Sequence, residues 1–441
     1  MKGEHQTTAV VISAGGAPAA YDIVRSLAVR GVRTTVASSQ RHDIAFYSRF
    51  SMERVVLPPF ESRNDQLIFN ILEWVAMGQR ERPVLYYTSD PQLSFVRRFR
   101  EKLSDLYRFL LPPEELLEQL FNKAAFASFA RRHHLPVPET SRVANVYQLR
   151  SVLRTIPLPC IVKPAFSEDW VWDTETQWRK FGPYKKALRR FTRREDLLEF
   201  CKDLPRRSAG FLVQSYIEGR DERIVSFHGY FNEDSHCLGY FLGRKIRTYP
   251  PHTGGSVYVE TIDDPVLAEK SIEYLQRAGF QGVVKIDYKW DDRAHEYKIL
   301  EINPRYNLWE LLGAHAGANL AWIAYRSQRG ESLELPQQYQ TGVRLLYFKQ
   351  DLRALLDGYR KSGEWTWSSY LRSIARKNIY RVFDARDPLP FIVSLAGFVK
   401  RNIVRAMQWR WPVERLGEYY ALLEMKMRRV MALGVSRTEK H

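Results

Sequence analysis

The stretch at residues 282–305, GVVKIDYKWDDRAHEYKILEINPR, restricts the fold of this chain more than any other. In its first half apolar residues alternate with charged ones, which is the period of a half-buried β-strand. A polar turn at 291–293 follows, and the run YKILEINPR is a second strand candidate. The stretch therefore predicts an antiparallel β-hairpin that carries carboxylates on both strands.

The charged side chains of this hairpin form a candidate metal site. The alternation predicts that one face of the second strand carries Tyr297, Ile299, Glu301 and Asn303. If the hairpin closes around its polar turn, Asp287 could lie opposite Glu301, although the sequence does not fix the register. Two carboxylates and an amide oxygen on rigid strands suit Mg²⁺, and Arg305 could hold a phosphate or carboxylate. An ordinary amphipathic hairpin with solvated charges explains the stretch equally well when it is taken alone.

Length and composition indicate a globular protein of several domains. At 441 residues the chain suggests about three domains, and a hydrophobic fraction of 45% is ample for buried cores. Cys160, Cys201 and Cys237 are too few and too widely spaced for a disulfide framework or a zinc site, which favours a reducing compartment. The sequence contains neither a signal-peptide-like core nor an apolar run of the roughly 18 residues that span a bilayer. We therefore expect a cytoplasmic location.

The first 110 residues predict an open parallel α/β sheet. A strand at 9–12, the small-residue turn SAGGAP, an amphipathic helix and the strand VRTTVAS form one β-α-β unit. Further strands are expected at 54–57 and 84–88, with a helix at 68–77 between them. Because the turn lacks the full G-x-G-x-x-G pattern, it only weakly suggests dinucleotide binding.

A different pattern begins after Pro112 and Pro113 and continues to the hairpin. It opens with two helices, at 114–120 and 122–134, followed by the extended run LPVP. The later segments CIVKPAF, FLVQSYIEGRDERIVSFHGYF and LGYFLGRKIRTYPPHTGGS predict strands, and 264–278 predicts a helix.

Taken in order, these segments resemble the ATP-grasp superfamily. Its members join a carboxylate to a nucleophile, usually an amine, through an acyl phosphate made from ATP. The resemblance covers roughly residues 1–330 and rests on an α/β domain, NK before LPVP, IVKP, VQSYIEGRDE and KIDY…LEINPR. Each piece alone is uninformative, but their order and spacing are specific. The segment GRKIRTYPP followed by a hairpin ending in EINPR is most similar to the carboxylate–amine ligases related to D-aspartate ligase.

The resemblance implies an α/β protein of the α+β grasp type. Residues 1–112 would form a Rossmann-like domain that precedes the grasp domain. Residues 113–335 would form the ATP-grasp domain, with a small lobe at about 113–210 and a large lobe at about 211–335. Residues 336–441 would form a basic, mainly helical C-terminal region.

The same resemblance implies residues that hold ATP. Lys123 and Lys163 would contact its α- and β-phosphates, because a polyphosphate removed from bulk water needs compensating cations. Gln214 and the backbone of Ser215 and Ile217 would hold the adenine, although the family often has Glu in place of Gln214.

Further residues would contact the ribose and the transferred phosphoryl group. Asp221 or Glu222 would accept from the ribose hydroxyls, and the sequence does not separate the two. Arg244, Lys245 and Arg305 would stabilise the phosphoryl group, since such stabilisers should be cationic and prepositioned.

Metal ions would lie between the hairpin and the phosphates. The resemblance implies that Asp287, Glu301 and Asn303 hold one or two Mg²⁺ ions, for which Mn²⁺ could substitute. The family more often has Glu at the first of these positions, so Asp287 favours monodentate or water-mediated binding. The loops at 248–256 and 170–184 would form the substrate walls, and His252 could assist deprotonation of an amine, although a lone loop histidine is more often incidental.

The predicted function is an ATP-dependent carboxylate–amine ligase that forms an amide bond and releases ADP and phosphate. Its partners would be a small-molecule carboxylate, with an amino acid as the expected donor, and an amine. The alternative is a nucleotide-binding, non-catalytic peripheral membrane or scaffold protein with a basic tail. The sequence identifies neither substrate and leaves the oligomeric state open.

The basic charge is concentrated at the C-terminal end. The net charge is +17, and residues 341–441 contain 20 Lys and Arg against 9 Asp and Glu, a balance of +11. The apolar run 389–399 continues into Lys400, Arg401, Arg405 and Arg410. The segment 389–411 could lie in the interface of an anionic membrane, with Trp409 and Trp411 as anchors. A helix packed on the body with a solvated basic face explains the same run. We expect no nucleic-acid partner, because the motifs of RNA-binding proteins are missing from the sequence.

Overall fold

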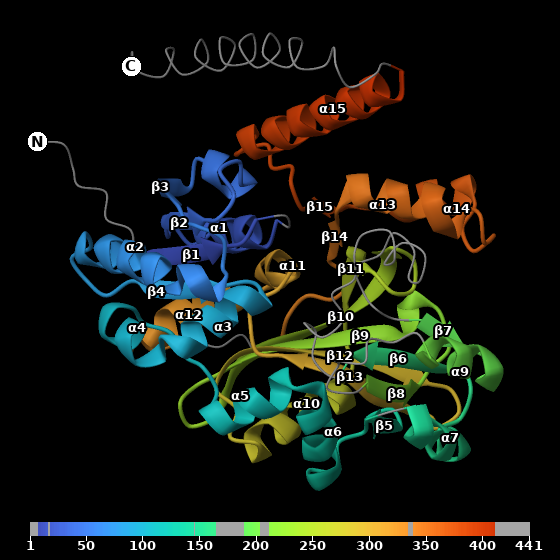
Figure 1. The fold of residues 1–441 in the computed structure, drawn as a ribbon. Helices are drawn as coiled ribbons and strands as arrows, with labels where there is room; N and C mark the ends of the chain where they lie inside the picture. The colour runs from blue at the N-terminus through green and yellow to red at the C-terminus, as the bar shows by residue number, and fades with distance from the viewer. Residues whose placement is uncertain are drawn as a thin grey trace, which may run out of the picture.

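The computed structural model describes residues 8–15, 18–144, 146–164, 189–202, 211–333 and 338–410. Three β-sheets organise this part of the chain: a parallel four-stranded sheet, a seven-stranded sheet and a second four-stranded sheet. The parallel sheet lies at the left in Figure 1, and the small four-stranded sheet lies at the right beside β12 and β13 of the large sheet.

The N-terminal sheet has the order β3-β2-β1-β4, and its strands are parallel. Its elements are β1 (Ala9–Ser13), α1 (Ala19–Ala28), β2 (Thr34–Ser38), the short helix η1 (Ile44–Tyr47), β3 (Ser51–Val56), α2 (Asp65–Met77), β4 (Val84–Tyr87), α3 (Asp90–Arg98) and α4 (Arg100–Leu106). Alternate residues of β1 face opposite cores, with Val10 and Ile12 towards α2 and α3 and Val11 towards α1. These elements confirm the parallel sheet predicted for the first 110 residues.

The large sheet has the order β13-β12-β9-β10-β11-β14-β15. Its strands are β9 (Ile224–Phe231), β10 (Cys237–Tyr249), β11 (Gly255–Ile262), β12 (Gly282–Asp291), β13 (Glu296–Asn303), β14 (Arg344–Leu346) and β15 (Ile379–Tyr380). All neighbouring pairs are antiparallel except β14 and β15. The predicted hairpin therefore forms one edge of a larger sheet, and five further strands extend that sheet beyond β12.

Helices cover both faces of the large sheet. One face packs against α5 (Glu114–Phe121), α6 (Lys123–Arg132) and α10 (Pro265–Arg277). The other face packs against α11 (Glu310–Ala316) and α12 (Leu320–Gln328), which also contact α1 of the N-terminal domain. One hydrophobic core thus joins the N-terminal domain to the large sheet.

The small sheet has the order β5-β8-β6-β7, and one of its faces packs against helices. Its elements are β5 (Thr140–Val143), α7 (Val146–Thr155), β6 (Cys160–Pro164), β7 (Arg189–Phe191), α9 (Arg194–Lys202) and β8 (Phe211–Ser215). Cys160, Val162 and Val213 pack with residues of α7 and α9, and the alternation along the strands turns Lys163 and Gln214 to the opposite face.

The C-terminal region is helical, but it does not stand apart from the large sheet. Its helices are α13 (Phe348–Ala354), η4 (Leu355–Tyr359), α14 (Trp367–Ile374) and α15 (Leu389–Arg410). The strands β14 and β15 extend the large sheet beyond β11, so the sheet crosses the predicted boundary at 335. Two strands of two or three residues carry too little periodicity to be found in the sequence. Within the described ranges, none of the helices combines the length and apolar character that crossing a membrane requires.

Candidate active site

The hairpin of β12 and β13 forms as predicted, and Asp287 pairs with Glu301. The predicted face of β13 is partly wrong. Tyr288 pairs with Ile299, so Leu300 is an additional residue that forms a β-bulge. The bulge leaves Ile299 in the core and turns Glu301 to the face of Asp287. Asn303 lies two residues further along the same face.

Asp287 is buried and surrounded by donors. Its carboxylate accepts from the Oγ of Ser226 at 2.5 Å and from the Nζ of Lys285 at 2.8 Å, and the Nζ of Lys245 lies 3.9 Å away. Burial alone would raise the pKa of Asp287, but Lys245, Lys285 and the hydrogen bond from Ser226 hold this pKa well below its usual range. Asp287 is therefore a buried anion that neutralises two lysines.

Three lysines on this face form what we call the lysine cluster: Lys245, Lys285 and Lys289. Burial lowers the pKa of Lys285, although the nearby Asp287 opposes the shift. Burial also lowers the pKa of Lys289 to about 8. The Nζ atoms of Lys285 and Lys289 lie 5.5 and 5.1 Å from the ring centroids of Trp309 and Tyr216. Lys285 and Lys289 were not predicted as site residues, although their alternation with Asp287 places them on its face.

A neutral buried network lies behind Lys285. The ring of His228 stacks between Phe241 and Trp309, at centroid distances of 4.4 and 5.0 Å, and burial lowers its pKa well below the usual value. The side-chain amide of Asn307 donates to the Nδ1 of His228 and to the carboxyl group of Glu310. Burial raises the pKa of Glu310 to about 8, so this network adds no negative charge that would compete with Asp287 near neutral pH.

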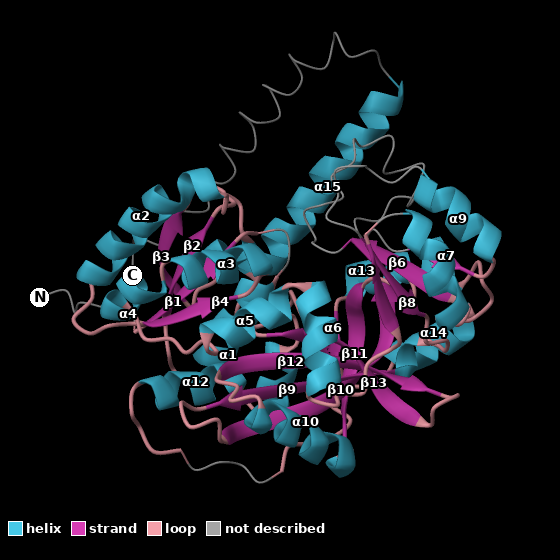
Figure 2. Cartoon of the chain, turned by 60° about the horizontal axis from the view of Figure 1, so that its bottom comes forward, coloured by secondary structure: helices cyan, strands magenta, loops and turns pink. Residues whose placement is uncertain are grey.

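A cleft of about 1000 Å³ lies between the small sheet, β13 and the helices α3 and α5. Figures 1 and 2 show the small sheet beside the β13 edge of the large sheet. The predicted residues Lys163, Gln214, Glu301 and Asn303 line this cleft. Asp90, Arg97 and Thr140 also line the cleft. The sequence did not indicate these three residues, because they lie outside the motifs that predicted the site.

The small-sheet wall of the cleft is a hydrogen-bonded chain of three residues. The Nζ of Lys163 donates to the Oε1 of Gln214 at 2.8 Å, and the Nε2 of Gln214 donates to the Oγ1 of Thr140 at 2.8 Å. These bonds hold the lysine across the cleft from Glu301. A phosphate that reached Lys163 would therefore lie between a cation on one wall and oxygen ligands on the other.

The predicted adenine segment is largely engaged within the protein. The backbone amide of Ser215 donates to the carbonyl of Glu139 at 2.8 Å, and Ile217 is buried. A base could use the amide of Ser215 only by replacing that bond. Lys123 opens α6, and its side chain lies outside the described part of the structure.

Asp221 and Glu222, the two ribose candidates, differ in their surroundings. Asp221 is buried and accepts from the hydroxyl groups of Thr248 and Tyr359, whereas Glu222 is exposed. Burial alone would raise the pKa of Asp221, but its bonds with His252, Tyr359 and Thr248 lower it. Tyr359 belongs to the C-terminal region, so a segment outside the predicted grasp domain holds this carboxylate inward.

The structure separates the three predicted phosphoryl contacts. Lys245 lies beside Asp287, but Arg244, the preceding residue of the strand, faces the other side of the sheet and pairs with Glu260 at 2.5 Å. Arg305 donates from its Nε to Asp90 at 2.5 Å and thereby connects the end of the hairpin to α3. The structure therefore does not place Arg244 with the lysine cluster.

The predicted metal ligands are only partly brought together. Glu301 and Asn303 line the cleft, whereas both oxygens of Asp287 already accept hydrogen bonds. Among the residues that the structure describes, no three His, Cys, Asp or Glu side chains form a metal-binding group. Carboxylate and amide oxygens on the cleft wall fit Mg²⁺ when nucleotide phosphates complete its ligands.

Of the two predicted substrate walls, the structure describes the loop 248–256. The segment 170–184 lies outside the described residues. In the loop 248–256, the Nε2 of His252 lies 2.8 Å from Glu364, and its Nδ1 lies 3.6 Å from Asp221. His252 is therefore engaged by two carboxylates in the structure.

Two curated relatives share part of their sequence with this chain. No protein-family model matches it. D-aspartate ligase of Enterococcus faecium (strain Aus0004) is 25% identical over 244 residues, which cover 54% of this chain and 56% of the relative. The arginine-specific large chain of carbamoyl phosphate synthase of Halalkalibacterium halodurans is 24% identical over 230 residues, which cover 50% and 20%. The chain thus matches less than two thirds of the length of either relative.

Solved structures match over most of the chain. N5-carboxyaminoimidazole synthetase of Staphylococcus aureus gives a TM-score of 0.58 at 14% identity and covers 82% of this chain and 88% of that structure. Biotin carboxylase of Campylobacter jejuni gives a TM-score of 0.58 at 13% identity and covers 77% of this chain and 74% of that structure. L-amino acid ligase of Bacillus licheniformis gives a TM-score of 0.52 at 14% identity and covers 74% of this chain and 75% of that structure. At these identities the likeness shows a shared fold, and it confirms the predicted architecture.

Proposed function

We propose, from the premise that this chain has the ATP-grasp fold and is a homologue of D-aspartate ligase, that it is an ATP-dependent carboxylate–amine ligase. The donor would be an amino acid, and the reaction would pass through an acyl phosphate and release ADP and phosphate. The observation that carries the proposal is the cleft in which Lys163 faces Glu301 and Asn303. The lysine cluster lies on the same sheet face as Glu301 and Asn303.

Residues of the cleft and of the sheet face that carries Glu301 suit the handling of a polyphosphate. Lys163 supplies a cation on the small-sheet wall of the cleft. Lys245 and Lys285, on the same face of the large sheet as Glu301, supply cations that Asp287 keeps in place. Prepositioned cations stabilise charge that develops during phosphoryl transfer without reorganising at that moment. Glu301 and Asn303 would hold magnesium, which when bound neutralises phosphate charge.

The proposed reaction has two steps. In the first, a carboxylate oxygen of the donor attacks the γ-phosphorus of ATP, and ADP leaves. In the second, the amine nitrogen attacks the acyl carbon, phosphate leaves with one former carboxylate oxygen, and the amine loses a proton. The phosphate therefore carries one oxygen atom from the donor.

Oxygen labelling tests both steps at once. The full-length protein would be incubated with ATP, Mg²⁺ or Mn²⁺, amine acceptors and a panel of amino acids labelled with ¹⁸O in the carboxylate. We expect phosphate that carries one ¹⁸O, together with an amide product, for at least one donor–acceptor pair. Release of unlabelled phosphate in every case would mean attack by water and would refute the ligase.

A second function, nucleotide binding without catalysis, is favoured by one observation. Both carboxylate oxygens of Asp287 accept hydrogen bonds from the protein, which leaves this predicted metal ligand engaged. Calorimetry that showed ATP binding, with no ADP formed for any donor–acceptor pair, would support this function. Formation of ADP that depends on a donor would exclude it.

A further inference from the structure

The helix α15 carries an unusual exposed stripe, which we define as Ile392, Leu395 and Val399. These side chains are 54%, 49% and 47% exposed, and their spacing of three and four residues places them on one side of the helix. Pro390, on the opposite side, is buried against the body. The helix is therefore packed on one side while an aliphatic stripe faces solvent on the other.

An aromatic row continues the apolar surface towards the preceding segment. The rings of Tyr380, Phe383 and Phe391 follow one another at centroid distances of 6.4 and 5.3 Å, and all three are exposed. Together with the stripe, they form a contiguous apolar patch on the C-terminal region. Patches of this kind on a soluble protein mark an interaction site.

The charges of the C-terminal region are separated by sign. Within residues 348–399, most acidic side chains are turned inward: Asp351 pairs with Arg247, Asp384 with Arg25 and Glu364 with His252, and Asp387 accepts hydrogen bonds from Ser48 and Tyr21. Exposed basic side chains remain at Arg360, Lys361, Arg372, Arg376, Lys377 and Arg386. In this described range Asp357 is the one exposed acidic residue. The exposed surface of residues 348–399 is therefore mainly cationic, because most of its carboxylates are used in contacts with the rest of the protein.

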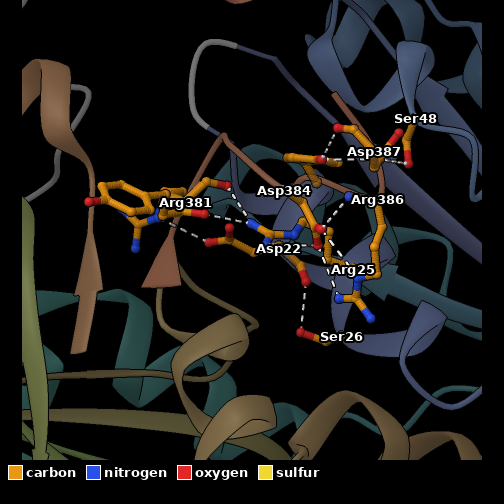
Figure 3. A network of polar contacts seen from close by, with 10 residues as sticks. Asp22, Arg25, Ser26, Ser48, Arg381, Asp384, Arg386 and Asp387 are labelled. Atoms are coloured by element: carbon orange, nitrogen blue, oxygen red, sulfur yellow. Dashed lines mark hydrogen bonds and ion pairs between the residues drawn. The ribbon is translucent and has the colours of Figure 1, made fainter. Parts of the chain in front are cut away.

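The patch is firmly attached to the rest of the molecule. Immediately before α15, Asp387 accepts from the Oγ of Ser48 at 2.6 Å and from the backbone amide of Arg49 at 3.0 Å, and Arg25 pairs with Asp384 at 3.2 Å (Figure 3). Figure 1 shows α15 extending away from this attachment along the outside of the molecule. These contacts fix the position of the start of α15, and therefore of the patch, relative to the N-terminal domain.

We propose that the stripe and the aromatic row dock on an anionic lipid surface, with the helix lying in the plane of the interface. The combination of exposed aliphatic and aromatic side chains with exposed basic side chains in the same region matches the chemistry of such an interface. The sequence of α15 agrees, because it contains Lys400, Arg401, Arg405 and Arg410 and no acidic residue. The docking does not depend on the ligase proposal.

Vesicle sedimentation with the full-length protein tests this proposal. We expect binding to vesicles of phosphatidylcholine mixed with phosphatidylglycerol, weaker binding as salt is raised, and little binding to phosphatidylcholine alone. The double variant I392D/L395D should bind the anionic vesicles at least about tenfold more weakly, because two aliphatic side chains that would be buried in the lipid are replaced by carboxylates. The matched control is W74D/M77D, which alters two side chains of α2 that are each 72% exposed, and its binding should equal that of the parent.

A second variant separates the apolar contribution from charge. L395K removes an aliphatic side chain and adds a cation, so it should weaken anionic binding if the stripe inserts and should not weaken it if charge alone acts. Equal vesicle binding by the parent and I392D/L395D, or no binding by the parent, would overturn the proposal. Light scattering that showed a dimer in the parent and a monomer in I392D/L395D, without vesicle binding, would instead make the patch a self-interface. Thermal unfolding of each variant confirms that its fold is retained.

Discussion

At the scale of single residues, Asp287 and Glu301 are paired across the hairpin but have opposite environments. Asp287 is buried with two lysines, whereas Glu301 is exposed on the wall of the cleft. The hairpin and its residue types could be predicted from the sequence pattern, whereas the register that pairs Asp287 with Glu301 came from the structure. The lysine neighbours could not be predicted either, because Lys245 comes from a strand distant in sequence.

These environments predict different effects for two neutralising variants. Asp287→Asn should lower the free energy of unfolding by about 3–5 kcal/mol, because Lys285 and Lys245 lose their buried counter-charge. Glu301→Gln should change it by less than about 0.5 kcal/mol while lowering the rate of ADP formation about a hundredfold. Urea unfolding and a coupled ADP assay measure the two effects.

The control for both variants is Glu296→Gln on the same strand. Glu296 is exposed at the turn end of the hairpin, and its carboxylate pairs with Lys298. Its replacement should change neither the free energy of unfolding nor the rate of ADP formation. An Asp287→Asn protein as stable as the parent would contradict the assignment of Asp287 as a buried counter-ion.

His252 gives the protein a pH-dependent contact. The nearby carboxylates of Asp221, at 3.6 Å, and Glu364, to which it is hydrogen-bonded at 2.8 Å, raise its pKa above 6.5 despite partial burial. A raised pKa means that the stabilisation is fully present below pH 6.5 and is lost as the pH rises through the raised value. The difference in Tm between the parent and His252→Gln should therefore be largest near pH 6 and should shrink at alkaline pH.

Thermal unfolding scans across this pH range measure the effect. His42→Gln, which alters a histidine near Tyr47 in the N-terminal domain, is the matched control and should show no such trend. A difference that grew with rising pH would show that His252 is bound in its neutral form.

At the scale of elements, a single additional residue orients the hairpin. Without the bulge at Leu300, the alternation along β13 would place Glu301 on the core face with Ile299. The periodicity of YKILEINPR therefore located the strand but assigned Tyr297 and Ile299 to the wrong side. A bulge has no periodic signal, because it is selected by the fit of β12 and β13 to the cores on their two faces.

The strand β10 is packed so closely that one methyl group should disturb it. A Cβ on Gly243 would lie 2.7 Å from the ring of Trp309, which is buried against His228. Gly243→Ala should therefore lower the free energy of unfolding by about 1–3 kcal/mol, and it should weaken ATP binding because Trp309 flanks Lys285.

The control for Gly243→Ala is Gly255→Ala, in the neighbouring strand β11. A Cβ there would meet no atom within 4 Å, so stability should stay the same or rise by less than about 1 kcal/mol. Chemical denaturation and calorimetry of nucleotide binding distinguish the two substitutions. A Gly243→Ala protein that matched the parent in both would show that Trp309 can move without cost.

At the scale of the whole molecule, the C-terminal region is part of the folded unit. Arg247 is fully buried, pairs with Asp351 at 2.7 Å and contacts the rings of Tyr258 and Tyr370. In the N-terminal domain, Asp22 is buried beside Arg381, and burial raises its pKa to about 7. Removing the C-terminal partners would leave these groups buried without counter-charges or expose them together with the edge of β11.

Two truncations test this integration. A protein ending at residue 343 should fail to unfold cooperatively, because it lacks β14, β15 and the partners of Arg247 and Asp22. A protein ending at residue 388 keeps these contacts and should retain a cooperative transition and ADP formation while losing vesicle binding. Circular dichroism during heating separates the outcomes, and a cooperative 1–343 protein would contradict the integration.

The sequence by itself determined the periodic elements and the order of the motifs. The parallel N-terminal sheet and the two strands of the hairpin follow from patterns within short segments, and the order of the motifs implied Lys163, Gln214, Glu301 and Asn303 through the family resemblance. Tertiary structure decided the rest: the bulge at β13, the lysine cluster around Asp287, the cleft walls from α3 and the inclusion of the C-terminal strands. These features depend on contacts such as Arg25 with Asp384, 359 residues apart in the chain, and no local period reports on them.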